Sequence, residues 1–384
     1  MARITMNQAT KAANAALVAH GAAPDHAAAT ANAVVGSEAL GTPGPGLSHL
    51  PDYCDALIKG RAYGNARPIL ERITPALMRI DAASGFPHLG IEEAWDEMVA
   101  GVWTNGIGML ALRNGFTSGS LSYYAMRLAE NHGLACLIAA NAGPAVVPMA
   151  GGTKPLFSTN PIAFGMPVEG AAPVIIDQSA SETAIVNIRQ AAEEGREIPE
   201  GWALGPDGQP TTDPNEAMNG ALLPYGGYRG ANMALMVEML AAGLTGAAWS
   251  HQAGSFLEGT KCPGVGLTII AFDPAMPGGG SWHMSTLVAQ MQQEPNGYIP
   301  GARKATCLTE SRVGGMDIDD ALWAATLVLA DTGAEAFANA EPIAEPNVEP
   351  MVEFLGEPLV EFTTAPLDEF AIDTSADPLS DPLA

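Results

Sequence analysis

Small hydroxyl and amide side chains gather in three turns that each follow a stretch with strand or helix character. The turns cover residues 114–119, 158–161 and 177–181. Each of these side chains offers a hydrogen-bond donor or acceptor without much bulk, which suits a ligand with several oxygen atoms. Ser, Thr, Asn and Asp also favour turns for backbone reasons alone. Taken singly, each turn is therefore a weak signal for a ligand site.

A glycine-rich turn at residues 225–230 leads into a helical run from about residue 231 to 242. Free backbone N–H groups and the positive end of the helix dipole meet at such a helix start. Arg229 adds a positive charge, so the turn suits an anion such as a phosphate or a carboxylate. The alternative is that the three glycines of this turn only permit tight packing of a helix end.

Several common catalytic motifs are absent from the sequence. It has no Gly-x-Gly-x-x-Gly turn after a strand, no Walker loop, no His-Glu-x-x-His and no Gly-x-Ser-x-Gly. The four cysteines lie far apart without a Cys-x-x-Cys pair, which favours reduced thiols in a cytoplasm over disulfides or zinc. No two histidines are spaced as a metal pair, and His20, His26, His132 and His251 are expected to be surface or capping residues.

Composition narrows the function further. The chain has 384 residues, 47% of them hydrophobic, which is enough for a sizeable core in two or more domains. The formal net charge of −25 argues against nucleic acid, whose phosphates need a basic surface. No secretory signal and no apolar run long enough to span a membrane is visible, so a cytoplasmic protein is expected.

The three polar turns must be positioned by a mixture of helices and strands. Hydrophobic periodicity and Gly or Pro breaks predict the following helices: two Ala-rich helices within 6–40, then 51–58, 91–102, a helix through 123–128, 184–192, 231–242, 285–293 and 317–329. Strands are predicted within 68–81 and over 109–113, 134–140, 162–164, 174–176 and 264–272. The helix over 231–242 is expected to be mostly buried, because Glu238 is its only charge.

The last part of the chain has a different character. Residues 341–384 contain eleven acidic and no basic residues, and prolines recur throughout. Repeated proline blocks a continuous helix, and the charge opposes collapse. A disordered acidic tail is therefore predicted, with binding of a partner as the minor alternative. Without its eleven charges the net charge falls from −25 to −14.

Seven segments, taken together and in order, resemble the type-2 malate/L-lactate dehydrogenase family, and most closely its Δ1-piperideine-2-carboxylate/Δ1-pyrroline-2-carboxylate reductase branch. The segments are GLSHLPDY (46–53), RNGFTSGSLSYY (113–124), STNPIAFGMP (158–167), VIIDQSAS (174–181), IPEGWAL (198–204), TTDP (211–214) and LLPYGGYRGANMALMVEMLAAGLTGA (222–247). The resemblance covers roughly residues 5–330 and stops before the acidic tail.

The resemblance implies an α/β, non-Rossmann NAD(P)-binding fold with a mixed, largely antiparallel sheet and a discontinuous helical domain. Residues 1–110 would form the N-terminal part of a helical, substrate-binding domain, and residues 111–280 the NAD(P)H-binding sheet domain. Residues 281–335 would be C-terminal helices that return to the first domain. The resemblance also implies a homodimer and a cofactor that is NADPH or NADH. The substrate would be a small 2-imino or 2-oxo carboxylate, as in proline metabolism.

Site residues are implied one by one. The cofactor-binding residues would be Thr117, Ser118, Gly119, Asp177, Gln178, Ser179, Gly301, Arg303 and Lys304, with Arg229 added by its place in the glycine-rich turn. The substrate would be contacted by Gly46, His49 and Thr159. Two cations at residues 303 and 304 are physically apt beside phosphate groups.

The sequence departs from the family where the chemistry is expected. The family's Ser-His-Gly, whose His supplies the proton, falls on Gly44-Pro45-Gly46, and its relay Asp falls on Asn187. The carboxylate-binding Arg falls on His49. Proline has no titratable group, so Pro45 cannot perform acid–base chemistry. An imidazole titrates near neutral pH, so His49 can either donate a proton or pair with a carboxylate, or it is a loop residue without a role.

Two hypotheses follow for the function. The first is an NAD(P)H-dependent reductase that transfers hydride to a small cyclic 2-imino acid, such as Δ1-pyrroline-2-carboxylate, or to a 2-oxo acid. Its catalytic residues would be His49 and Asn187. The second is a catalytically impaired paralogue that keeps the fold and binds nucleotide only.

Overall fold

The structure is a computed structural model, and it describes residues 1–338. The predicted acidic tail, residues 341–384, lies outside the described residues. The α-helices are α1 Met6–Ala19, α2 Pro24–Ala39, α3 Leu50–Ile58, α4 Pro87–Asn105, α5 Leu121–Met126, α6 Ile185–Glu194, α7 Pro214–Met218, α8 Tyr228–Glu238, α9 Gly280–Met291, α10 Ala302–Gly314 and α11 Asp320–Ala338. Short 3-10 and π-helical segments are η1 Leu47–His49, η2 Arg127–Asn131 and η3 Met239–Gly243.

The strands alternate with these helices along the chain. They are β1 Ala2–Ile4, β2 Ile69–Thr74, β3 Leu77–Asp81, β4 Ile107–Gly115, β5 Ala135–Ala140, β6 Val147–Pro148, β7 Pro155–Phe157, β8 Ile162–Met166, β9 Val174–Gln178, β10 Ala203–Leu204, β11 Pro210–Thr211, β12 Ala221–Leu222, β13 Val265–Phe272 and β14 Met316–Ile318.

A seven-stranded sheet organises the described part of the chain. Its order is β2-β3-β4-β13-β5-β8-β9, and β3–β4 is its parallel pairing, whereas the other five pairings are antiparallel. The prediction of a mixed, largely antiparallel sheet is therefore confirmed. The sheet takes in β2 and β3 as well as the later strands, so residues on both sides of the predicted domain boundary at 110 share one sheet. The domain boundaries themselves stay a prediction.

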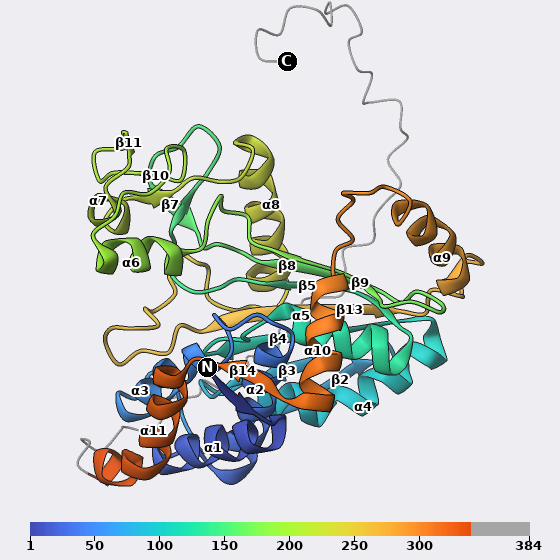
Figure 1. Ribbon diagram of the computed structural model, residues 1–384, viewed down its shortest axis with the longest axis horizontal. Coiled ribbons are helices and arrows are strands. Elements are labelled where there is room, and N and C mark those ends of the chain that lie inside the picture. The colour runs from blue at the N-terminus through green and yellow to red at the C-terminus, as the bar shows by residue number, and fades with distance from the viewer. Residues whose placement is uncertain (339–384) are drawn as a thin grey trace, which may run out of the picture. The chain divides into compact units, whose positions relative to one another are not determined.

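Helices from both ends of the described chain pack together. Helix α1 packs against α2 and α11, and β1 pairs with β14 in antiparallel register (Figure 1). A capping box starts α1, because the Thr5 hydroxyl accepts from the Gln8 amide and the Gln8 side chain accepts from the Thr5 amide. The helix predicted over 317–329 begins later, at Asp320, because Met316–Ile318 forms strand β14 and pairs with β1.

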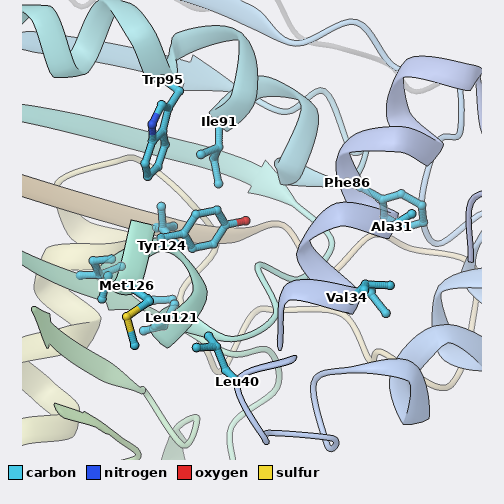
Figure 2. Packing of buried hydrophobic residues seen from close by; sticks show 14 of the residues in the cluster. Ala31, Val34, Leu40, Phe86, Ile91, Trp95, Leu121, Tyr124 and Met126 are labelled. Carbon is cyan, nitrogen blue, oxygen red and sulfur yellow. The ribbon is translucent and has the colours of Figure 1, made fainter. Parts of the chain in front are cut away.

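The main core lies between α2, α4, α5 and the sheet. Figure 2 shows Tyr124 of α5 between Trp95 and Ile91 of α4 and Leu121 and Met126 of its own helix. These side chains are buried, and burial of a large apolar side chain stabilises the fold by about 1.5–3 kcal/mol. The core thus fixes α5, the helix that follows the polar turn at 114–119.

A second apolar cluster supports the smaller sheet, β11-β10-β12. It contains side chains of α6, of α7 and of the segment that follows β9. Ala180, Ile188 and Leu222 are among its buried members. Helices α6 and α7 lie beside this small sheet (Figure 1). No helix within residues 1–338 is both long enough and apolar enough to cross a membrane.

Three expectations from the sequence are wrong. The helix predicted over 231–242 is not mostly buried: α8 starts at Tyr228, continues as η3, and exposes Leu235, Met236 and Met239. The strand over 174–176, whose three apolar residues predict a buried strand, instead lies at a sheet edge and leaves Ile176 exposed. His26 is buried, with its ring bonded to the Ala66 carbonyl oxygen, instead of lying at the surface or at a cap; His20 is buried too, but as expected it occupies a cap, the C-cap of α1.

Candidate active site

Strand β9 and helix α5 meet through one carboxylate. The backbone N–H and the hydroxyl of Ser122 both donate to Asp177 Oδ2, at 2.9 and 2.6 Å. Ser122 is in the first turn of α5, where backbone N–H groups lack partners inside the helix. The carboxylate therefore joins the end of β9 to the turn that contains Thr117, Ser118 and Gly119. Two of the three predicted polar turns come together in this way.

A basic turn packs against the same strand. The N–H of Ile175 donates to the carbonyl oxygen of Pro300 at 3.1 Å. Gly301 has φ +90°, and a Cβ there would lie 2.6 Å from the Ile175 backbone nitrogen, so only glycine lets this turn approach β9. Arg303 is exposed, Lys304 is half-buried, and neither forms an ion pair within residues 1–338.

The glycine-rich turn before α8 lies at the other end of β9. The Gln178 amide donates to the Tyr225 hydroxyl at 3.4 Å, and the Tyr225 N–H donates to the Ala180 carbonyl oxygen at 3.1 Å. A Cβ at Gly230 would collide with the backbone of Tyr225, so this glycine has a packing reason. Arg229 is exposed, with its guanidinium 5.8 Å from the centre of the Tyr228 ring. Both interpretations of this turn, anion site and tight packing, therefore have a structural basis.

The turn at 158–161 is held by Glu238, the last residue of α8. Glu238, 3% exposed, accepts from the Asn160 amide at 2.7 Å and from the Ser250 N–H and hydroxyl at 2.6 Å each. The same turn contacts the residues that follow β9, because the Ala180 N–H donates to the Thr159 carbonyl oxygen at 2.7 Å. Thr159 is thus fixed beside Ser179, whose hydroxyl donates to the Ser181 carbonyl oxygen at 3.2 Å.

His49 has a carboxylate partner that the sequence analysis missed. His49 Nδ1 lies 2.9 Å from Asp52 Oδ2, and both side chains are about a quarter exposed. Burial raises the pKa of the Asp52 carboxyl, but the His49 hydrogen bond and the charges of His49, Arg189 and Arg61 outweigh it, so the pKa is lowered. An ionised Asp52 accepts a hydrogen bond from Nδ1–H, so this contact does not occupy the other ring nitrogen, Nε2. The i, i+3 spacing at the start of α3 was the available signal.

Behind His49 lies a buried row of rings. The His49 and Tyr53 rings are in edge contact at 5.0 Å, the Tyr53 hydroxyl lies 3.3 Å from His88 Nε2, and His88 Nδ1 lies 2.6 Å from the Tyr124 hydroxyl. A Cβ at Gly119 would lie 3.6 Å from the Tyr53 hydroxyl, so the row reaches the predicted cofactor turn. Burial, with smaller effects of other histidines, lowers the pKa of His88 to about 3, so its imidazole is neutral.

The loop that carries Gly44, Pro45 and Gly46 contains no titratable side chain. It is held by Glu38 of α2, whose Oε2 accepts from the Leu47 N–H at 2.9 Å. A Cβ at Gly46 would collide with the Glu38 carboxylate, so the glycine permits this contact. Burial raises the pKa of the Glu38 carboxyl, and the backbone hydrogen bond offsets part of that rise.

Asn187 lies apart from the histidine. It is an exposed residue of α6, and its amide donates to the Thr183 hydroxyl at 3.0 Å. No hydrogen bond joins Asn187 to His49 in the described part of the chain. The guanidinium of Arg189, two residues further on, does contribute to lowering the Asp52 pKa, which brings α6 within electrostatic reach of α3. No group of three His, Cys, Asp or Glu side chains within residues 1–338 is arranged to hold a metal ion.

Sequence reasoning found the turns but not the residues that join them. Ser122 and Tyr225 were inside recognised segments, yet their partners, Asp177 and Gln178, lie about 50 residues away in the chain. The position of Ser122, in the first turn of a helix after the polar turn, was the signal that could have been used for it.

Comparison with known proteins gives a consistent result. A model of the malate/L-lactate dehydrogenase family matches residues 4–326. A Δ1-pyrroline-2-carboxylate reductase of Ancylobacter novellus is 36% identical over 324 residues, which are 83% of this chain and 94% of that protein. A (2R)-3-sulfolactate dehydrogenase (NADP(+)) of Chromohalobacter salexigens is also 36% identical, over 78% of this chain and 90% of its own.

A solved structure extends the likeness to the fold. The crystal structure of Δ1-piperideine-2-carboxylate reductase from Pseudomonas syringae pvar. tomato matches with a TM-score of 0.81 at 31% identity. The match covers 86% of this chain and 100% of that one.

Proposed function

This chain belongs to the malate/L-lactate dehydrogenase family of oxidoreductases, and we propose that it reduces a small cyclic 2-imino acid with NADPH or NADH. Two relatives support this substrate class, since one is a Δ1-pyrroline-2-carboxylate reductase and the other a Δ1-piperideine-2-carboxylate reductase. A 2-oxo or 2-hydroxy acid is the other substrate class, in line with the sulfolactate dehydrogenase relative.

The observation that carries the proposal is the assembly around β9. Asp177 joins the 117–119 turn through Ser122, and the backbone of Ile175 holds the 300–304 turn. Hydroxyl and amide groups for a ribose or a nicotinamide therefore lie around the strand that also holds the turn with Arg303 and Lys304, two cations that form no ion pair within residues 1–338. Arg303 and Lys304 suit phosphate oxygens, because charge-assisted hydrogen bonds are stronger than neutral ones. When bound, the nicotinamide cofactor supplies the hydride.

His49 is the residue proposed to meet the substrate. Its Nδ1 is engaged by Asp52, so Nε2 is available for a substrate carboxylate or for proton transfer. Gly46 and Thr159 are proposed to border the same substrate. A cyclic imine can arrive with its nitrogen already protonated, so that binding and orientation supply most of the catalysis. Reduction of a 2-oxo acid needs a proton donor for the forming alkoxide, and Pro45 cannot supply one.

The alternative is a paralogue that binds nucleotide but turns over poorly. The Gly44-Pro45-Gly46 loop and the exposed position of Asn187, which has no hydrogen bond to His49 in the described chain, motivate it. Under this alternative the residues around β9 keep their role and the substrate end of the site does not.

Two measurements test the proposal in sequence. We expect NADPH or NADH to show saturable binding to the full chain in a titration monitored by nicotinamide fluorescence. The Asp177→Ala variant should bind the cofactor more weakly. Δ1-Pyrroline-2-carboxylate should then oxidise the cofactor at a measurable steady-state rate. Binding without turnover on imino and 2-oxo acids would favour the impaired paralogue. Absence of cofactor binding would reject both readings.

Self-association is also part of the proposal. Helix α8 and η3 expose apolar side chains in a row, with Leu235 43%, Met239 50% and, just beyond, Leu244 64% exposed. Clustered exposed apolar residues mark interaction surfaces more often than isolated ones do. We propose that this row, defined as the α8 surface (Tyr228, Leu235, Met236, Met239 and Leu244), forms the contact between two copies in a homodimer.

A further inference from the structure

A cavity lies away from the residues proposed to bind cofactor and substrate. It has a volume of about 330 Å³ and is bordered by α1, α2, α4, α5–η2 and α10. None of the proposed cofactor or substrate residues lines it. Its size falls at the lower end of the range for small-molecule sites, about 300–1,000 Å³.

Two ion pairs form the charged part of its wall. Arg127 pairs with Glu92 through both guanidinium Nη atoms, and Arg312 pairs with Glu130 through two hydrogen bonds of 2.9 Å. Arg127 and Glu130 lie three residues apart on η2, so the two pairs are neighbours. The cavity therefore presents two positive and two negative groups with no net charge.

The remaining wall combines apolar and uncharged polar side chains. Met6, Val35, Leu40, Met126 and Leu308 contribute aliphatic surface, the Tyr123 ring packs on Gly36 of α2, and Thr10, Asn32 and Asn131 add polar groups. A ligand with one net charge would face two groups of its own sign. A wholly apolar ligand would take the ion pairs out of water without replacing their lost solvation, which is costly.

We propose that this cavity binds a small zwitterion with an apolar body, namely an α-amino acid with an aliphatic side chain or ring. The ligand's carboxylate adds hydrogen bonds to Arg127 or Arg312, and its ammonium group to Glu92 or Glu130. The apolar body lies against the aliphatic wall. A carboxylate and a guanidinium that already form a pair retain free lone pairs and N–H groups for such contacts.

The cavity shares two helices with the proposed cofactor site. Helix α10 begins beside β9 at the 300–304 turn, and its last turn carries Arg312 into the cavity. Helix α5 begins at the Ser122–Asp177 contact, and its continuation η2 carries Arg127 and Glu130. Occupation of the cavity is therefore coupled to cofactor binding, in both directions, as linkage requires. This coupling rests on the proposed function, whose product would be an amino acid of the same class.

The test is calorimetric titration of the full chain with L-proline and L-pipecolate. Saturable binding is expected, and Arg312→Gln or Glu130→Gln should weaken it by about tenfold, as expected for loss of a charge-assisted hydrogen bond. Arg196→Gln is the matched control, because it breaks an exposed Arg–Glu pair outside the cavity. Cyclopentanecarboxylate and pyrrolidine, each with one charge only, should bind more weakly than L-proline.

Product binding in the proposed active site must be told apart from binding in the cavity. Binding in the cavity persists in His49→Gln and is weakened in Arg312→Gln. The reverse pattern would overturn the inference while leaving the proposed reductase intact. Absence of saturable binding up to about 10 mM would also overturn it. If L-proline binds in the cavity but imino acids are never reduced, the cavity stands and the proposed function fails. Equal L-proline affinity with and without saturating NADPH would overturn the coupling.

Discussion

At the scale of single residues, the site differs from the family pattern mainly in the side chains expected beside the substrate's charged groups. His49 stands where the family's carboxylate-binding arginine is implied, and Asp52 holds its Nδ1. An ionised carboxylate that accepts a hydrogen bond from Nδ1 fixes the orientation of the imidazole ring. This geometry favours binding of the substrate carboxylate by His49 over proton donation.

Substitution of His49 separates the two roles. We expect His49→Arg to retain kcat within about threefold and to keep KM, because a guanidinium also binds a carboxylate. His49→Gln should raise KM by about tenfold or more, as expected when a charged partner is lost. Steady-state kinetics with Δ1-pyrroline-2-carboxylate measure both. A fall in kcat of about 100-fold for His49→Arg at unchanged KM would instead identify His49 as the proton donor.

His88 provides a pH-dependent element of stability. Burial holds its pKa at about 3 in the folded chain, below the usual 6.5, so between these values the unfolded chain binds more protons. The contribution of neutral His88 to the free energy of unfolding is therefore complete above pH 6.5. It is lost as the pH falls toward 3, by up to about 1.4 kcal/mol per pH unit.

Urea unfolding of the His88→Gln variant between pH 7 and pH 4 tests this. The variant should be less stable at pH 7 by about 1–2 kcal/mol, since hydrogen bonds to Tyr53 and Tyr124 change. Its stability should fall less steeply with acid than that of the parent chain. His283→Gln, at an exposed position of α9, is the control and should keep the parent slope. An unchanged slope in His88→Gln would mean that other groups, such as His26, dominate.

At the scale of elements, β9 is the strand on which the site depends. It lies at the edge of the sheet, where one side is free to receive the 300–304 turn instead of another strand. Its last residues deliver Asp177 to α5 and Gln178 to the turn before α8. An edge strand offers unpaired backbone groups, and here Ile175 uses one of them to hold the basic turn.

Gly301→Ala tests that junction. The added Cβ would meet the Ile175 backbone, and alanine disfavours φ +90°, so we expect a loss of stability of about 1–3 kcal/mol. Displacement of Arg303 and Lys304 should also weaken NADPH binding by about tenfold, the effect of one lost charge-assisted contact. Gly278→Ala is the matched control, because Gly278 has φ +94° but open space around its Cβ. Equal effects on cofactor affinity in the two variants would contradict the role of the junction.

The elements themselves were largely predictable, and their contacts were not. The two Ala-rich helices, the strand and turn within 68–81 and the strand over 264–272 follow from local periodicity and breakers. The burial of Glu238 could not be predicted in this way, because its hydrogen-bond partners Asn160 and Ser250 belong to other segments of the chain. The exposed face of α8 was missed for the opposite reason, since apolar composition alone does not distinguish a core from a surface that meets a partner.

At the scale of the whole molecule, the proposed homodimer would cover the exposed apolar face of α8. Tyr228, Leu235 and Met239 recur at helical spacing, on the face opposite to buried Ala234 and Val237. Two copies that meet through the same helix face bury this row twice, which is the usual geometry of a symmetric dimer. The row is also continuous with Arg229 and the turn that contacts Gln178, so a partner there would lie close to the proposed cofactor residues.

The Met239→Asp/Leu244→Asp double variant should therefore shift the protein from dimer to monomer, measured as molar mass by light scattering after gel filtration. Burying an unpaired carboxylate in an apolar contact is strongly unfavourable, whereas on a free surface it costs little. Val18→Asp, at a similarly exposed apolar residue of α1, is the control and should remain dimeric. Because the α8 surface adjoins the turn at Gln178, the monomer should also bind NADPH less tightly. A double variant that stays dimeric would mean that the dimer contact lies elsewhere. A parent chain that is already monomeric would contradict the proposed homodimer.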